Sequence, residues 1–451
     1  MEELRKRVST SALHDTSTRQ GDQTTDCHPK TRRRLLGELA DVLGNSQNKV
    51  NWLYGPAGAG KTSIMRSLAS LFEQRGQFIG GFHFWRSDSG RNTLKHFVAT
   101  LAFQLAQNEP KTFPFITRAL TRDSLLLDKS TKTQMEKLVI EPLLACSAGK
   151  PLAGARRCIL VDGLDECDED GQREFLEACL PTLISRLSSV DIAFFISSRP
   201  ERAIDNFFTH PRLSNSTNRI FLEPSFEDVQ EFLAAEFEEI NRCHPKLKKK
   251  YGGKWPKDQQ LDRLVEKSSG YFILCATAMR HINPPILHGR PPDQRLDDVL
   301  EAVSADTLRP LDALYLLILR QHAPKLPVPL SQWKRSIGLV CMALDLSDNA
   351  SPWLIFDDEA TPVIELWHEM DVSTLEELLS GLESLLYFDE ETGQPKIYHA
   401  SFPDFIFNQS RSQEFFMDSG YLHSELACVI VKTLNSRPPP TRTSSVRLIS
   451  R

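Results

Sequence analysis

The sequence lacks the features of a membrane protein and of a disulfide-stabilised scaffold. None of its nine cysteines belongs to a C-x-x-C pair, and a chain of 451 residues is not small. No apolar run is long enough to span a bilayer. The N-terminus, MEELRKRVST, has no apolar segment typical of a secretory signal. We therefore expect reduced thiols and a cytoplasmic protein without a membrane span.

An excess of positive charge and internal repeats are also missing. The formal net charge is −5, which argues against nucleic acid or a membrane surface as the main partner. Hydrophobic residues make up 40% and charged residues 25% of the chain, as in folded soluble proteins. The length predicts about two to four domains.

The most informative segment that is present is GPAGAGKT, residues 55–62. It matches the phosphate-binding pattern G-x-x-x-x-G-K-S/T, in which glycines let backbone N–H groups point at phosphate oxygens. Lys61 would reach the β- and γ-phosphates, and the Thr62 hydroxyl would bind Mg²⁺. A predicted strand at 50–54 and a predicted helix at 63–72 flank this loop, as such a site requires. Its candidate nucleotide-binding residues are Gly55, Pro56, Ala57, Gly58, Ala59, Gly60, Lys61, Thr62 and Ser63.

The second motif is a predicted buried strand that ends in carboxylate residues. The run RCILVDGLDEC places Asp162 at the strand's carboxyl end, where parallel α/β sheets bind their ligands. We predict that Asp162 binds Mg²⁺, usually through water. Asp165 and Glu166 follow on the loop, where a carboxylate can orient and deprotonate a water for attack on the γ-phosphate. Both are therefore catalytic candidates.

The next predicted strand, IAFFISSRP, also ends in polar residues. Ser198 would form a hydrogen bond near the γ-phosphate, and Arg199 would sense or stabilise its charge. The motif is informative because it follows the Asp162 strand.

The order of elements predicts an α/β fold. Apolar, strand-like runs at 50–54, 78–85, 158–163, 192–198 and 219–222 alternate with helical patterns, which indicates a parallel sheet. The polar segment 1–25 is expected to be mostly disordered or a frayed helix.

After Pro224 the strand pattern stops. Residues 226–241 and 258–282 are predicted to be amphipathic helices, and the proline-containing segment 283–296 a linker. The segment Ser373–Glu376 is a capping box before a leucine-rich helix, and two strand-like pieces around a Gly/Pro turn follow it. This combination suggests a winged helix. The tail from Ser436 is expected to be unstructured.

The motifs GPAGAGKT, ILVDGLDE and FFISSRPE, in this order, resemble a NACHT domain, a branch of the STAND class of P-loop ATPases that act as signalling switches. CHPKTRRRLL, FHFWRSDSGRNTLKHFVATLAFQL, SSGYFILCATAMR and HASFPDFIF resemble the fungal NACHT proteins in particular. The resemblance covers roughly residues 25–425.

The resemblance implies a five-stranded P-loop NTPase core, a helical domain and a winged-helix domain that closes over the nucleotide. It implies that Thr31 and Arg32 flank the adenine, that Arg199 is the sensor arginine, and that His399 contacts the β-phosphate of bound ADP. The domains expected on this basis are a disordered segment at 1–25, the NACHT core at 26–224, the helical domain at 225–297, the winged-helix-like domain at 298–425, and a helix remnant with the proline-rich tail at 426–451.

The sequence also departs from the family. Such proteins usually carry an N-terminal effector domain and C-terminal repeats, and neither pattern is found here. An acidic stretch with a tryptophan, Phe356–Asp371, matches none of the family segments. We expect either a truncated form of a longer protein or partner modules on other chains.

The leading hypothesis is an ATP/ADP-operated signalling switch with slow, Mg²⁺-dependent hydrolysis, acting in innate-immunity or incompatibility-type signalling through self-association or other signalling proteins. Two alternatives remain: a turnover P-loop ATPase or kinase, and a nucleotide-stabilised scaffold without hydrolysis. The absence of an N-K-x-D motif after the Asp162 strand argues against a GTPase. The predicted leucine helix carries Glu376, Glu377 and Glu383 and few basic residues, which argues against DNA binding.

Overall fold

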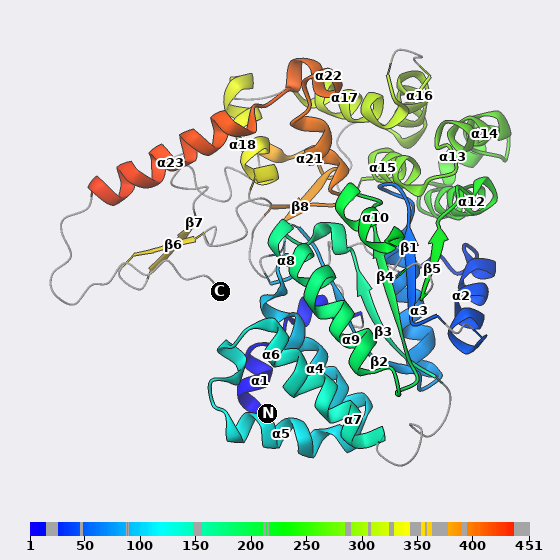
Figure 1. Cartoon of the computed structure of the whole chain (residues 1–451). Coiled ribbons are helices and arrows are strands. Elements are labelled where there is room, and N and C mark those ends of the chain that lie inside the picture. Colours follow the sequence, from blue (N-terminus) through cyan, green and yellow to red (C-terminus); the bar gives the residue numbers. More distant parts are fainter. Residues whose placement is uncertain are drawn as a thin grey trace. The chain divides into compact units, whose positions relative to one another are not determined.

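The computed structural model describes most of the chain, which forms two compact units (Figure 1). The first extends to Glu223 and the second begins at Pro224, except that Ala57–Ala59 are grouped with the second unit. The described residues are 1–14, 26–45, 48–86, 88, 90–147, 156–210, 213, 216–284, 290–304, 308–323, 329–342, 353–356, 359–362, 378–388 and 395–436. The predicted capping box Ser373–Glu376 and the proline-rich tail lie outside them.

The first unit contains a five-stranded sheet in which all paired neighbours are parallel, with the order β2-β3-β4-β1-β5. Its strands are β1 (Val50–Tyr54), β2 (Phe78–His83), β3 (Arg157–Asp162), β4 (Ile192–Ser198) and β5 (Thr217–Phe221). The α/β prediction of a parallel core is confirmed. Because the strands are parallel, their carboxyl ends lie at one edge of the sheet.

The strand that carries the phosphate-binding loop, β1, lies between β4 and β5 rather than beside β3. All seven residues of β4 are buried, as expected for a strand with both faces of the sheet covered. In β1, Trp52 stacks on Tyr54 and Phe208, with ring centroids 4.4 and 4.7 Å apart. The β4 strand therefore separates the loop strand from the carboxylate strand.

Helices surround the sheet in the first unit (Figure 1). The α-helices are α1 (Glu2–Lys6), α2 (Arg33–Asn45), α3 (Lys61–Gln74), α4 (Phe97–Asn108), α5 (Phe113–Arg122), α6 (Thr131–Met135), α7 (Glu141–Ser147), α8 (Glu169–Glu174), α9 (Leu180–Arg186) and α10 (Arg202–Thr209). Short 3₁₀ helices are η1 (Thr10–Ala12), η2 (Leu94–His96), η3 (Pro110–Thr112), η4 (Leu126–Asp128) and η6 (Leu164–Glu166), and η5 (Glu136–Ile140) and η7 (Phe175–Cys179) are π-helices.

The N-terminal residues differ from the expected disorder. Leu4 of α1 and Ala12 of η1 are completely buried in the core of the first unit. The backbone N–H of Ser9 donates to the Thr100 hydroxyl at 3.0 Å. Two buried apolar side chains in a polar stretch give too weak a periodicity to be recognised in the sequence, but they anchor residues 1–14. The rest of the expected disordered segment lies outside the described residues.

The second unit is mainly helical, as predicted. Its helices are α12 (Phe226–Cys243), α13 (Pro245–Lys250), α14 (Asp258–Lys267), α15 (Phe272–Ile282), α16 (Pro292–Ala302), α17 (Pro310–His322), α18 (Leu330–Met342), α21 (Ser401–Ile406), α22 (Gln409–Ser412), η9 (Gln413–Phe415) and α23 (Ser419–Ser436). None of the helices in the described part of the chain combines the length and the apolar character needed to cross a membrane.

Two helices of this unit have bounds that the sequence did not predict. The predicted helix 258–282 is interrupted, because Ser269 and Gly270 adopt left-handed φ angles of 53° and 77°. A Cβ atom on Gly270 would approach the Pro224 side chain to 2.6 Å, so the position requires glycine. The predicted linker 283–296 is shorter than expected, since α16 begins at Pro292.

The two strand-like pieces predicted around the Gly/Pro turn form an antiparallel hairpin of β8 (Leu386–Phe388) and β9 (Pro395–Ile397). Helix α21 follows, and Phe402 and Phe405 pack on Tyr315 of α17 with centroids 5.3 and 5.1 Å apart. A second hairpin, β6 (Trp353–Phe356) with β7 (Glu359–Pro362), partly overlaps the acidic stretch that matched no family segment.

Candidate functional site

The loop after β1 has the backbone geometry of an anion-binding turn. Gly58 and Gly60 have φ angles of 74° and 88°, in the left-handed region that favours glycine. Helix α3 begins directly after the loop, at Lys61. Loop N–H groups and a helix N-terminus together favour a bound anion. The predicted site residues Gly55 to Gly60 therefore form the turn at the carboxyl end of β1, and Lys61, Thr62 and Ser63 open helix α3.

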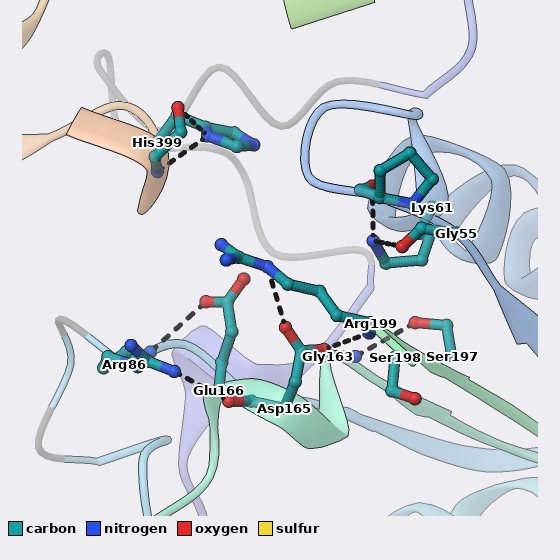
Figure 2. Close-up of polar contacts among 12 residues, drawn as sticks. Gly55, Lys61, Arg86, Gly163, Asp165, Glu166, Ser197, Ser198, Arg199 and His399 are labelled. Carbon is teal, nitrogen blue, oxygen red and sulfur yellow. Dashed lines mark hydrogen bonds and ion pairs between the residues drawn. The ribbon is translucent and has the colours of Figure 1, made fainter. Parts of the chain in front are cut away.

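Lys61 lies over this loop. Its Nζ donates to the carbonyl oxygens of Gly55 and Pro56, each at 3.0 Å (Figure 2). Burial lowers the pKa of the Lys61 ammonium, and the nearby carboxylates of Asp165 and Asp162 counteract this effect. The two carbonyl bonds hold the ammonium beside the turn that would cradle a phosphate chain.

Asp162, at the carboxyl end of β3, is only 1% exposed. Its Oδ2 lies 3.2 Å from His83 Nδ1, and its Oδ1 accepts a hydrogen bond from the Ser197 hydroxyl. Burial alone would raise the pKa of Asp162. Hydrogen bonds from His83, Ser197 and Thr62, together with attraction to His83, nevertheless hold this pKa below its ordinary value. Asp162 is therefore an ionised carboxylate at neutral pH.

Thr62 and Asp162 are chemically suited to Mg²⁺. The Thr62 side chain is hydrogen-bonded to Asp162, so a hydroxyl oxygen and a carboxylate oxygen lie together. Mg²⁺ prefers oxygen ligands, retains several waters and is commonly completed by substrate phosphates. Within the described residues, no group of three or more His, Cys, Asp and Glu side chains could hold a metal ion. The ion would thus depend on phosphate and water oxygens as well.

The two carboxylates after Gly163 have different surroundings (Figure 2). Asp165 is 2% exposed, its Oδ1 accepts the Arg199 N–H at 2.9 Å, and its Oδ2 lies 3.2 Å from Arg199 Nε. Glu166 is only partly buried, and its Oε2 accepts the backbone N–H of Arg86 at 3.3 Å. Burial, and then repulsion from Asp165, raise the pKa of Glu166 to about 7.

A glycine positions this carboxylate turn. Gly163 has a φ of 69°, and a Cβ there would lie 3.0 Å from the carbonyl oxygen of Phe84. Its N–H donates to the Ser197 hydroxyl at 3.0 Å, which ties the end of β3 to β4. Arg86 Nη2 also donates to the Asp165 carbonyl at 3.0 Å. The backbone of the turn is therefore held by side chains from the ends of the two strands beside β3.

Ser198 lies beside Trp52 of β1. Its hydroxyl accepts the Trp52 indole N–H at 2.9 Å, and the residue is completely buried. Successive side chains of a strand point to opposite faces of the sheet. Ser197 therefore faces Asp162, and Ser198 faces the opposite side. The serine beside the predicted Mg²⁺ ligand is Ser197, and the γ-phosphate contact of Ser198 stays a prediction.

Thr31 and Arg32 lie just before α2, and both are almost completely buried. The Thr31 hydroxyl donates to the His28 carbonyl at 3.1 Å. Arg32 has a φ of 56°, and its Nη1 donates to the carbonyl of Glu223, just beyond β5. The preceding segment contacts α3, since the Cys27 N–H donates to the Ser67 hydroxyl at 2.9 Å. Both residues thus lie in a segment that joins α3 to the carboxyl end of the sheet.

His399 belongs to the second unit and lies between β9 and α21. Its Nδ1 accepts the backbone N–H of Ser401 at 3.1 Å and lies 2.7 Å from the Ser401 hydroxyl (Figure 2). The Ser401 hydroxyl in turn lies 2.8 Å from the Tyr315 hydroxyl. These contacts make Nδ1 an acceptor and leave the ring proton on Nε2.

Three residues near the carboxylates were missed by the sequence analysis: His83, Arg86 and Ser197. His83 and Arg86 lie in the FHFWR segment, which was quoted only for its resemblance to the family. The register of the sheet pairs His83 with Asp162. Strand order and register would have been needed to find these neighbours, because no local motif carries that information.

Residues 37–199, less than half of the chain, match the family model of the N-terminal region of nephrocystin 3. No curated protein matches the chain.

Among solved structures, a Walker-type ATPase of Pyrococcus abyssi has a TM-score of 0.39 and 12% identity, covering 84% of this chain and 97% of that one. The ORC2 protein of Aeropyrum pernix in its ADP form has a TM-score of 0.36 and 12% identity, covering 93% and 99%. Cdc6p of Pyrobaculum aerophilum has a TM-score of 0.33 and 14% identity, covering 95% and 99%.

The parallel sheet and the glycine loop that joins β1 to α3 are the features that define a P-loop NTPase fold.

Proposed function

We propose that the chain binds ATP and ADP through its first unit and acts as a signalling switch of the NACHT type, with slow Mg²⁺-dependent hydrolysis. One observation carries the proposal. Lys61, Asp162, Asp165, Glu166 and Arg199 come from three different segments and meet around the carboxyl ends of β1, β3 and β4. A cation beside a glycine loop, followed by carboxylates and a second cation, is the set of groups that phosphoryl transfer uses.

In this proposal the loop N–H groups and Lys61 hold the phosphate chain. Thr62 and Asp162 hold Mg²⁺, which would neutralise charge on the phosphates when bound. Thr31 and Arg32 would line the adenine side, because their segment contacts α3 and the end of β5. These positions are the ones that the family resemblance suggests.

The surroundings of the two loop carboxylates support different roles. Asp165 is tied to Arg199 through both oxygens and is almost completely buried, so it supports the turn. Glu166 is partly accessible, and its pKa of about 7 is suited to a group that takes a proton from water. We therefore propose Glu166 as the general base. Arg199 would sense the γ-phosphate through its guanidinium.

The second unit would supply the element that responds to the nucleotide. The β8–β9 hairpin and α21 support the proposed winged helix, although the capping box of its leucine helix lies outside the described residues. We propose that His399 contacts the β-phosphate of ADP through Nε2. ATP and ADP would then shift the switch only by their different affinities for its two states.

Two alternatives are distinguished by rate. The near-neutral pKa of Glu166 also suits a turnover ATPase, for which hydrolysis above about one per second would be expected. A scaffold would bind nucleotide tightly and release no phosphate even with Mg²⁺. Measurement of phosphate release at saturating Mg·ATP separates the three, and the switch predicts a slow but measurable rate.

Calorimetric titration of ADP and ATP into the parent protein, Lys61→Ala and Lys49→Ala tests nucleotide binding itself. Lys49 is a matched control, because it lies at the amino end of β1 and donates to the Val190 carbonyl. We expect 1:1 binding by the parent and Lys49→Ala, and a loss of at least about tenfold in Lys61→Ala. Equal affinity for all three proteins would reject the proposed site.

A further inference from the structure

The carboxylate of Asp162 is held from both sides by residues of the two neighbouring strands. His83 ends β2 and contacts Oδ2 at 3.2 Å, whereas Ser197 of β4 donates to Oδ1. A carboxylate oxygen accepts hydrogen bonds. His83 Nδ1 must therefore carry the proton that it shares with Oδ2.

The sheet register explains why these side chains meet. His83 pairs with Asp162 across β2 and β3, and paired residues of parallel strands lie on the same face. Val161 pairs with Ile196, so the next residue pair along β3 and β4 is Asp162 and Ser197. His83 is 5% exposed, Asp162 is 1% exposed and Ser197 is completely buried.

This cluster has a consequence for a bound cation. A carboxylate that binds Mg²⁺ directly or through a coordinated water must present one lone pair in a fixed direction, because Mg²⁺ demands near-ideal octahedral geometry. Free rotation of the carboxyl group would lose that direction. Hydrogen bonds to both oxygens from two rigid strands prevent the rotation, as partners of metal-binding carboxylates do elsewhere.

We infer that His83 and Ser197 are positioning residues that orient the Asp162 carboxylate for Mg²⁺. Neither residue needs to touch the ion or the nucleotide. The inference rests on the proposed function, since it concerns the cation of the same site. It assigns a role to two residues that carry no motif, and it predicts that the effect of losing them is specific to Mg²⁺.

The test compares ADP affinity in saturating Mg²⁺ with ADP affinity in EDTA, by calorimetry, for the parent, His83→Phe and Ser197→Ala. A Mg²⁺ titration of each ADP complex then gives the affinity for the ion. We expect both variants to keep the parent's ADP affinity in EDTA and to lose about 10- to 100-fold in Mg²⁺ affinity. His83→Asn, which keeps an N–H near the Nδ1 position, should recover most of the loss.

Ser198→Ala is the matched control, because this serine is adjacent but faces Trp52 on the other side of the sheet. It should leave Mg²⁺ affinity unchanged. Ser197→Ala also removes the acceptor of the Gly163 N–H, so thermal unfolding of each variant is measured as well.

The outcomes separate the inference from the proposed function. A variant whose ADP affinity falls equally in Mg²⁺ and in EDTA would show a merely structural role and overturn the inference. Unchanged Mg²⁺ affinity in both His83→Phe and Ser197→Ala would also overturn it. If the parent binds no ADP under either condition, the proposed function itself fails.

Discussion

Asp165 contacts Arg199 through both carboxylate oxygens. One oxygen accepts the arginine's backbone N–H at 2.9 Å, and the other lies 3.2 Å from its Nε. The pair joins the turn after β3 to the end of β4. Asp165 is 3% exposed at its side chain and Arg199 is 20% exposed. The carboxylate is thus buried in the turn, while the guanidinium reaches the surface of the first unit.

We predict that Arg199→Ala lowers the free energy of unfolding by about 1.5 to 3 kcal/mol, because Asp165 is left buried without its charged partner. Arg202→Ala, on the exposed side of α10, should change it by less than about 0.5 kcal/mol. Urea unfolding of the three proteins measures both values. Equal midpoints and slopes for Arg199→Ala and the parent would contradict a structural role for the pair.

The pH dependence of hydrolysis follows from Glu166. Its carboxyl group accepts a proton from water only when it is ionised, and its pKa is raised to about 7. The single-turnover rate with Mg·ATP should therefore rise with pH, reach half of its maximum near pH 7 and level off above about pH 8. Glu166→Gln should bind ATP and hydrolyse it at least about 100-fold more slowly. A rate that is flat with pH would argue against Glu166 as the base.

The same pKa predicts an effect on stability. The folded chain keeps the Glu166 proton up to about pH 7, whereas the unfolded chain loses it near its ordinary value of 4.5. Stability from this group is therefore present below about pH 4.5 and is lost as the pH rises through 7. Glutamine does not ionise, so Glu166→Gln avoids the cost of the charged carboxylate in the folded chain. The variant should be more stable than the parent at pH 8 by at most about 3 kcal/mol, since contact with solvent reduces this cost.

Denaturant unfolding at pH 5 and pH 8 measures this difference. The advantage of Glu166→Gln should be small at pH 5 and large at pH 8. An advantage that is the same at both pH values would show that the substitution acts through packing rather than through ionisation.

The hydrogen-bond chain of the second unit predicts the state of His399. Tyr315 is buried, which raises its pKa to about 12, so its hydroxyl keeps its proton and can donate to Ser401. Ser401 then donates to His399 Nδ1. Long-range ¹H–¹⁵N NMR of labelled protein should find Nδ1 unprotonated and Nε2 protonated. Tyr315→Phe and Ser401→Ala should weaken this preference, and a protonated Nδ1 in the parent would refute the chain.

The sequence predicted the strands of the first unit well, because parallel strands buried on both faces produce continuous apolar runs such as residues 192–198. It also predicted the glycine loop, in which the pattern fixes Gly60, one of the two left-handed positions. These features are local in the chain. Their physical cause lies within a few residues of the motif itself.

Features that depend on packing between distant segments were harder to predict from the sequence. Both Ser197 and Ser198 end a buried strand, and the sequence does not say which faces Asp162; the structure assigns that face to Ser197. The proximity of His83 to Asp162 depends on strand register. The break at Ser269 and Gly270 arises from close packing against Pro224, which a helical periodicity does not reveal.

In the proposed function, the first unit binds a polyphosphate through its loop and Lys61. The most direct measurement is the nucleotide content of the purified protein, by chromatography after denaturation, followed by calorimetric titration of ADP with Mg²⁺ into nucleotide-free protein. We predict close to one ADP per chain, retained or restored on titration. Protein that carries no nucleotide and shows no binding heat for ADP or ATP would contradict the account.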